Sequence, residues 1–311
     1  MPFVISPKLL NALLIPALIL STAQAQFTLP AAATTGTMAR PIPEPPRDIS
    51  LVEKKWEELG NHAVGKDGEL ALSIKPEKWK HAETPHFILH FRRFTEAGKV
   101  AREVEFDLWL VVTTLGAGLD ANTRKGNVFI FEDETEWNTF LVKTNAPLWS
   151  HSFAQGNRLF LNIRQNSGTL DSHTLAHETT HTVISLLYPG ESWPIWLNEG
   201  FAEYMGGACV AARNHQFLKY TQRELKQAEL TLDDLFAIEK YPETTEKVTQ
   251  LYQTSEKFVR FLMNEFPKDR FRQFVSEVID SNDPKAALLK VYGDKIKDFE
   301  AFKTRFSRFT K

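Results

Sequence analysis

The segment from Ser172 to Leu187 constrains the fold most, because it reads as one helix with clear ends. Asp171 or Ser172 can cap its start, and the sequence Tyr-Pro-Gly at 188–190 should stop it. Within this helix, residues 177–181 read His-Glu-Thr-Thr-His. The sequence therefore predicts a helix that carries a compact polar motif.

His177 and His181 stand four residues apart, so both imidazoles project from one face of the helix and can bind one ion. Zinc suits imidazole and carboxylate ligands, and a catalytic zinc ion usually takes three protein ligands and a water. The motif predicts such an ion, with Glu178 beside it; a solvated helix face is the alternative. The next segment weighs against that alternative, because Glu199 and Glu203 add two carboxylates at helical spacing.

Together the two segments resemble the gluzincin metallopeptidases, the group that contains thermolysin and the aminopeptidase N family. The resemblance lies in His-Glu-x-x-His followed by Trp-Leu-Asn-Glu-Gly-Phe-Ala-Glu-Tyr at 196–204. It implies one zinc ion, with Glu199 as the third ligand; Glu203 or another carboxylate is the alternative. It also implies that Glu203 supports the outer ring nitrogen of His177.

The resemblance implies a mechanism as well. Glu178 would take a proton from the zinc-bound water and pass it to the leaving amine. In gluzincins a tyrosine or histidine further along the chain often stabilises the oxyanion. Tyr252, in an apolar stripe of helical spacing from Val248 to Leu262, is the candidate for that role, and His215 is a weaker one. A tyrosine that only packs in the core is the alternative for Tyr252.

Gluzincins bind the substrate backbone along a sheet edge beside the zinc helix. A strand expected at 158–163 precedes that helix, and it is either this edge or an interior strand. The Gly-x-Met-Glu-Asn signature with which aminopeptidase N relatives capture a free N-terminus is absent, because residues 153–157 read Phe-Ala-Gln-Gly-Asn. We therefore expect an endopeptidase acting on peptides or proteins. A zinc-binding scaffold with little turnover and a zinc hydrolase of a non-peptide amide or ester are the alternatives.

The first 25 residues read as a signal peptide, with Lys8 as their only charge and an Ala-x-Ala site at 23–25. The apolar run from Leu9 to Leu20 is too short to cross a bilayer. We expect cleavage after Ala25 and a secreted or periplasmic protein without stable membrane insertion. The proline-rich residues 26–50 predict a linker.

The rest of the sequence predicts an α+β fold with a small mixed sheet, followed by an all-helical lobe. The α/β zinc-binding lobe is expected at 51–207 and the helical lobe at 208–311. Strands are expected at 86–91, 127–131 and 158–163, and further helices at 97–115 and 134–142. The terminal Phe stripe, at 299, 302, 306 and 309, should dock onto the core.

The remaining features point to no further site. A net charge of −2 offers no electrostatic reason to expect a nucleic-acid partner, and the oligomeric state is not indicated. The single cysteine, Cys209, excludes an intramolecular disulfide within this sequence and reads as a small buried residue. His86 and His90, on one face of a strand, are interpreted as paired or solvated residues and not as metal ligands.

Overall fold

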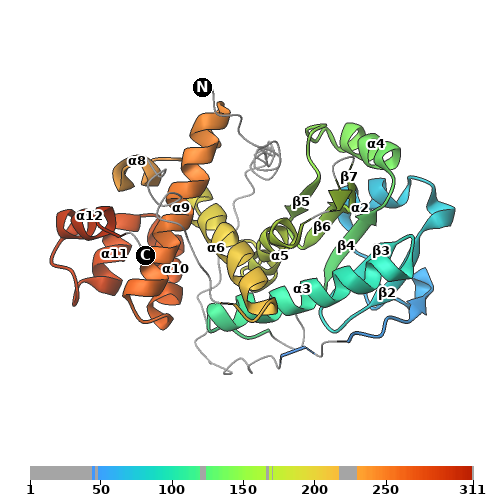
Figure 1. Cartoon of the computed structure of the whole chain (residues 1–311), viewed down its shortest axis with the longest axis horizontal. Helices are drawn as coiled ribbons and strands as arrows, with labels where there is room; N and C mark the ends of the chain where they lie inside the picture. Colours follow the sequence, from blue (N-terminus) through green and yellow to red (C-terminus); the bar gives the residue numbers. More distant parts are fainter. Residues whose placement is uncertain are drawn as a thin grey trace, which may run out of the picture.

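The computed structural model of the protein describes residues 44–45, 48–119, 124–165, 168–169, 171–216 and 230–309. The predicted signal peptide, residues 1–25, lies outside the described residues, as does most of the predicted linker. The expected α+β architecture is confirmed: a sheet forms in the first half of the chain and helices follow it (Figure 1). In the described part of the chain, no helix has the length and apolar character needed to cross a membrane.

A six-stranded mixed sheet forms the first layer, in the order β1-β2-β3-β4-β6-β5. The strands β3, β4 and β6 run parallel, whereas β1, β2 and β5 pair antiparallel with their neighbours. The bounds are β1 (Glu53–Lys54), β2 (Lys80–Glu83), β3 (Phe87–Phe91), β4 (Gly126–Phe131), β5 (Ser152–Gln155) and β6 (Arg158–Asn162). A separate antiparallel pair consists of β7 (Arg164–Gln165) and β8 (Gly168–Thr169). The strand expected at 158–163 is therefore an interior strand, and β5 forms the edge.

Within the described residues the α-helices have the following bounds: α2 (Gly65–Leu72), α3 (Phe94–Thr114), α4 (Glu134–Thr144), α5 (Ser172–Leu187), α6 (Ile195–Arg213), α8 (Leu232–Phe236), α9 (Thr245–Glu265), α10 (Asp269–Ser281), α11 (Pro284–Tyr292) and α12 (Phe299–Ser307). Two short 3-10 helices, η1 (Trp56–Glu58) and η2 (Pro76–Lys78), precede β2. The predicted boundary between lobes at residue 207 falls inside α6.

Both faces of the central strands are covered, which is usual for parallel strands. Val128 and Ile130 of β4 face α3 and α5, within one apolar core. Phe129 and Phe131 of the same strand face α4, within a second core. The alternation follows from the two-residue period of a strand, and it places α5 directly against one face of the sheet (Figure 1).

A tight hairpin fixes the edge strand β5 against β6. Its two-residue turn begins at Gly156, whose φ of +60 is a backbone conformation that glycine adopts without strain. The amide of Asn162 donates to the carbonyl of His151, so odd-numbered residues of β5 pair with β6. Residues 152 and 154 therefore direct their backbone groups to the outer edge of the sheet.

The C-terminal part of the chain is helical, as the sequence predicts, and its helices pack around an apolar cluster that is continuous with the core between the sheet, α3 and α5. Phe258 of α9 lies at its centre and contacts aromatic rings of α6, α8, α10 and α12, namely Trp196, Phe236, Phe274, Phe302 and Phe306. The predicted docking of the terminal Phe stripe is confirmed, because Phe302, Phe306 and Phe309 are buried. The core holds α9 against α6, which lies between α9 and α5 (Figure 1).

Candidate metal centre

The helix α5 carries the polar motif in the position that the sequence predicts. The Asp171 carboxylate caps its start by accepting the amide hydrogen of Thr174 at 2.9 Å. One and two turns further along, His177 and His181 project from the same face. Their Nε2 atoms are 3.0 Å apart, and the His177 side chain is almost completely buried.

The third group of the cluster, Glu199, comes from the first turns of α6. Its Oε2 lies 3.4 Å from Nε2 of His177 and 3.5 Å from Nε2 of His181. One ligand atom from each of the three residues lies within 4.8 Å of the other two, so they could hold one metal ion. The packing of α6 on α5 brings together the three residues that the sequence selects as ligands.

The outer ring nitrogens show which atoms face the centre. Nδ1 of His177 lies 3.2 Å from a carboxylate oxygen of Glu203, and Nδ1 of His181 lies 3.1 Å from Oδ1 of Asn198. Both neighbours are acceptor oxygens, although only the contact between His181 and Asn198 has the geometry of a hydrogen bond. A neutral ring that carries its proton on Nδ1 turns the lone pair of Nε2 inward. The Nε2 lone pairs of the two histidines and the buried Oε2 of Glu199 then point at one another, and a cation placed between them relieves their repulsion. The donor set, two imidazoles and one carboxylate, fits zinc.

The charges within the cluster lead to the same conclusion. Burial by itself lowers the pKa of His177, but hydrogen bonds to Glu199 and Glu203 raise it well above its usual value. Burial alone would raise the pKa of Glu199, but His181 and His177 hold it well below its usual value. The buried site therefore stabilises a positive charge at its centre, whether that charge is a proton or a metal ion.

Glu178 lies beside the three ligand residues and contacts the edge of the sheet. Its side chain is buried, and the Ser152 hydroxyl of β5 donates to its Oε1 at 3.3 Å. Its Oε2 has no hydrogen-bond partner among the described residues. Burial raises the pKa of this carboxyl, although the two histidines oppose the shift. A carboxylate in this environment can exchange a proton with a neighbouring group.

Tyr252, the candidate identified from sequence, reaches the site from α9. Its ring stacks on the ring of His177 with centroids 6.1 Å apart, and it is almost completely buried. Burial and the negative charge of Glu199 raise the pKa of its hydroxyl well above the usual value. The hydroxyl lies close to Glu199 but makes no well-formed hydrogen bond to a described residue.

A second tyrosine at the site, Tyr241, was missed by the sequence reasoning. It lies in the loop between α8 and α9, and its hydroxyl donates to Oε1 of Glu199. No helical or strand pattern surrounds this residue, so no local signal distinguished it. Because Oε2 of Glu199 faces the histidines, the bond from Tyr241 orients the carboxylate from the opposite side.

The other residues considered from sequence lie away from the site. His215 follows the end of α6, roughly 24 Å from Glu199 at the rise of a helix. His86 pairs with Glu105 at 2.6 Å, and Nδ1 of His90 lies 2.9 Å from Nδ1 of His81, so their interpretation as paired strand residues agrees with the structure. Cys209 is buried, as expected.

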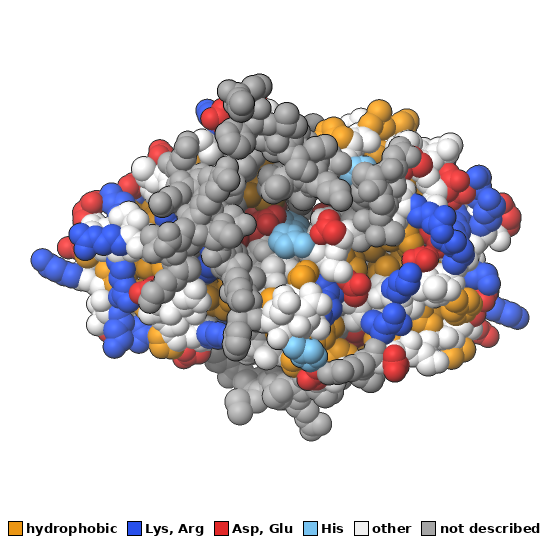
Figure 2. Space-filling view, in the orientation of Figure 1, with side chains coloured by type: hydrophobic (Ala, Val, Ile, Leu, Met, Phe, Trp, Pro, Cys, Tyr) orange, Lys and Arg blue, Asp and Glu red, His pale blue; other side chains and the backbone are white. Residues whose placement is uncertain are grey.

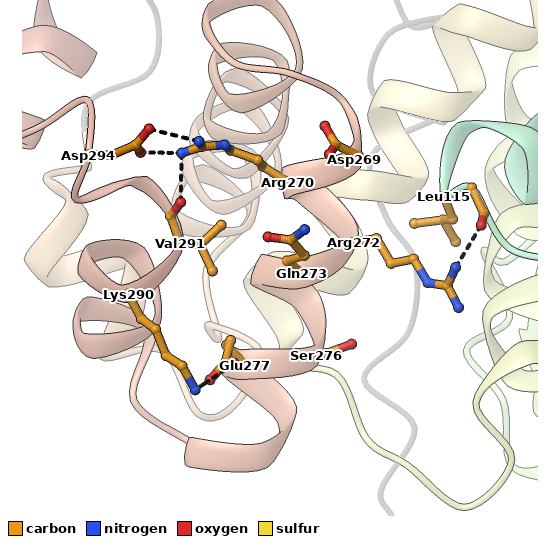
Figure 3. A pocket seen from close by; sticks show the side chains of 11 residues that line it. Leu115, Asp269, Arg270, Arg272, Gln273, Ser276, Glu277, Lys290, Val291 and Asp294 are labelled. Atoms are coloured by element: carbon orange, nitrogen blue, oxygen red, sulfur yellow. Dashed lines mark hydrogen bonds and ion pairs between the residues drawn. The ribbon is translucent and has the colours of Figure 1, made fainter. Parts of the chain in front are cut away.

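A separate open pocket of about 990 Å³ lies between the end of α3 and the helices α10 and α11 (Figure 3). Its charged side chains bind one another: Arg270 pairs with Asp294, and Lys290 pairs with Glu277. Arg272 donates to the backbone carbonyl of residue 116 (Figure 3). Most of the charge that lines the pocket is therefore paired internally, and Asp269 is the lining residue whose carboxylate forms no ion pair among the described residues.

The fold and the centre together define a class of protein. A helix with the His-Glu-x-x-His motif lies against a mixed sheet, and the next helix adds a carboxylate that faces both histidines, which is the ligand arrangement of a metallopeptidase. The sequence of residues 115–309 matches the peptidase MA superfamily, and the chain belongs to it. The match contains the whole candidate centre. No curated protein sequence matches the chain.

Proposed function

We propose that the protein is a zinc-dependent metallopeptidase, and that it acts as an endopeptidase on peptides or proteins. The observation that carries the proposal is the convergence of His177, His181 and Glu199 with Glu178 beside them. A purely structural zinc site has no use for a buried carboxylate next to its ligands, whereas hydrolysis requires a base there.

The roles of the residues follow from their positions. His177, His181 and Glu199 would hold one zinc ion, which when bound supplies activation of a water and of the substrate carbonyl. Glu178 accepts the proton of the attacking water at Oε2, because Ser152 occupies Oε1. It then donates that proton to the leaving amine. Its buried position favours this transfer by keeping the pKa above that of an exposed glutamate.

The two tyrosines would have different roles. The hydroxyl of Tyr241 is engaged with Glu199, so we assign it to the orientation of that ligand. The hydroxyl of Tyr252 lacks a well-formed bond to a described residue, so it can donate to the developing oxyanion. Tyr252→Phe should then lower kcat while zinc affinity stays nearly constant, and Tyr241→Phe should weaken zinc binding.

We assign substrate backbone binding to the edge strand β5. Residues 152 and 154 present outward backbone groups there, and Ser152 contacts Glu178 directly, so a peptide added as an extra strand would pass the catalytic base. The stretch 153–157 in this hairpin lacks the signature that captures a free N-terminus, which supports an endopeptidase. The proposed peptide-binding edge is therefore β5, and not the strand at 158–163 that the sequence suggested.

The test compares zinc content and cleavage of an unstructured protein mixture in the parent and three variants. Glu178→Gln should keep one zinc ion per chain and lose turnover by about a thousandfold. His177→Ala should lose both zinc and turnover. Glu191→Gln, an exposed carboxylate beyond the end of α5, is the matched control and should behave as the parent.

The outcomes separate the candidate functions. Zinc without turnover in the parent would point to a binding scaffold, and turnover of esters alone would point to a non-peptide hydrolase. Unchanged cleavage in Glu178→Gln would remove the assigned base and with it the proposed mechanism.

We also propose a secreted or periplasmic location, which is supported by the leader at residues 1–25 alone. Expression of the full chain in a bacterial host, followed by N-terminal sequencing of the exported protein, tests it. Cleavage after Ala25 supports the proposal, and an uncut protein retained in the cytoplasm contradicts it.

A further inference from the structure

Two large apolar side chains stand at the tip of a tight turn just before the edge strand. The amide of Ser150 donates to the carbonyl of Pro147 at 2.9 Å, so Leu148 and Trp149 occupy the two central positions of this turn. Such positions usually hold Gly, Asn, Asp or Ser. Here Leu148 is 64% exposed and Trp149 is 43% exposed. Isolated apolar residues on a surface are ordinary, but an adjacent pair at a turn tip calls for an explanation.

The turn is held in place by buried hydrogen bonds. The indole of Trp137, a buried residue of α4, donates to the carbonyl of Ser150 at 2.6 Å. The hydroxyl of Ser150 donates to the carbonyl of Ser152 at 3.0 Å, and Ser150 itself is buried. These bonds tie the turn to the first residue of β5. Its two apolar side chains are therefore presented in a set position relative to the edge strand.

The turn lies close to the candidate centre. Trp149 precedes Ser152 by three residues, which separates them by at most about 10 Å, and the Ser152 hydroxyl contacts Glu178. Val142, in the last turn of α4, adds a third exposed apolar side chain in this part of the chain. Figure 2 shows hydrophobic side chains over α4 and, nearer the middle of the same face, histidine and acidic side chains.

We infer that the turn at 147–150 is a subsite for a large apolar side chain of an extended peptide bound along β5. The inference rests on the proposed function, because it assumes that the substrate is a peptide. It adds a preference for a large apolar side chain in that peptide. A peptide paired with β5 advances at the same rise as the strand, so its side chain about three residues from the scissile bond reaches Leu148 and Trp149. Two side chains at a turn tip are too small a surface for a stable protein partner, but they suit one substrate residue.

The experiment measures peptide binding to Glu178→Gln, which should keep its zinc but not cleave. Two short unstructured peptides of equal length and charge are titrated, one with Leu at alternating positions and one with Ser in their place. The Leu peptide should bind about fivefold to tenfold more tightly, as expected for partial burial of one large apolar side chain. Adding Leu148→Ser or Trp149→Ala should abolish most of that difference. Leu289→Ser, the same change at a 39% exposed residue of α11, should leave it intact.

Three results would overturn the inference. They are equal binding of the two peptides, a preference that survives both turn variants, and the absence of any peptide binding. Leu148→Ser should also leave sedimentation and binding to phosphatidylcholine-phosphatidylglycerol vesicles unchanged. A loss of self-association or of vesicle binding in that variant would instead assign the turn to a second copy or to a membrane. Because binding is measured without turnover, a parent that binds the Leu peptide but cleaves nothing would refute the proposed function and leave the subsite standing.

Discussion

The close approach of α9 to α6 at Gly200 places Tyr252 beside the candidate metal centre, and Gly200→Ala tests this arrangement. A Cβ atom at this position would lie 2.5 Å from the carbonyl oxygen of Ser255, which is backbone and cannot rotate away. That is about 1 Å shorter than a comfortable contact between heavy atoms. Glu199 precedes Gly200, and Tyr252 lies almost one turn before Ser255, so α9 can move away only by disturbing the centre.

The expected magnitude combines two opposite effects. Replacing glycine with alanine inside a helix contributes about 0.5 to 1 kcal/mol of stability, whereas overpacking against a backbone costs about 1 to 3 kcal/mol. The net effect of Gly200→Ala should be a loss of about 1 to 2 kcal/mol, which for a chain of this length is a decrease in Tm of about 2 to 4 °C. Zinc affinity should fall about tenfold, because the groups around Glu199 shift.

The assay is thermal and urea unfolding followed by circular dichroism, with a chelator present so that bound metal does not mask the change, and then a zinc titration. Gly98→Ala is the matched control, because a Cβ atom on this residue of α3 would meet only the end of a flexible arginine, 3.8 Å away. It should raise stability by about 0.5 to 1 kcal/mol. Finding that Gly200→Ala stabilises the protein as Gly98→Ala does would refute the close-contact reasoning.

Three further predictions concern acid stability, thiol reactivity and a helix cap. Burial alone would raise the pKa of Glu83, but hydrogen bonds from a backbone amide and from Lys54 and Lys125 lower it to about 2, below the usual 4.5. The stabilisation that the Glu83 carboxylate gives to the fold is therefore present above about pH 4.5 and lost as the pH falls to 2. In urea unfolding, Glu83→Gln should lower the free energy of unfolding by about 1 kcal/mol at pH 7 and by little at pH 2. An equal loss at both pH values would contradict this prediction. Burial raises the pKa of the Cys209 thiol well above its usual value, so a thiol reagent should label it only after unfolding, and rapid labelling of the folded protein would be evidence against this. Asp171→Ala should lower the free energy of unfolding by about 1 kcal/mol through loss of the α5 cap, and an unchanged urea midpoint would speak against the cap.

The parts of the centre that could be predicted are those that depend on local spacing. His177 and His181 share a face because helical periodicity is a property of neighbouring residues. The position of Glu199 does not follow from local spacing, because it depends on the packing of α6 against α5. Only the resemblance to the family motif suggested that Glu199 lies beside the two histidines. Tyr241 could not be predicted: it reaches Glu199 from 42 residues away, out of a loop with no periodic pattern.

The sheet shows the same division. The strands at 87–91, 126–131 and 158–162 were recognisable from alternating or continuous apolar residues. The four residues of β5, Ser-Phe-Ala-Gln, are too few to show a clear pattern, so the sheet edge was sought one strand away. Which strand lies at an edge depends on long-range pairing. Here the short hairpin between β5 and β6 places β5, and not β6, at the edge of the sheet.

The sequence by itself determined the helix at 172–187, the face that His177 and His181 share on it and the helical character of the C-terminal part, because these follow from residue spacing within each segment. Only the tertiary structure decided the rest: the edge strand beside Glu178, the approach of α9 to α6 at Gly200, and the bond from Tyr241 to Glu199. These features join segments that are distant in the chain, and the packing of one element on another, rather than any local pattern, sets their distances.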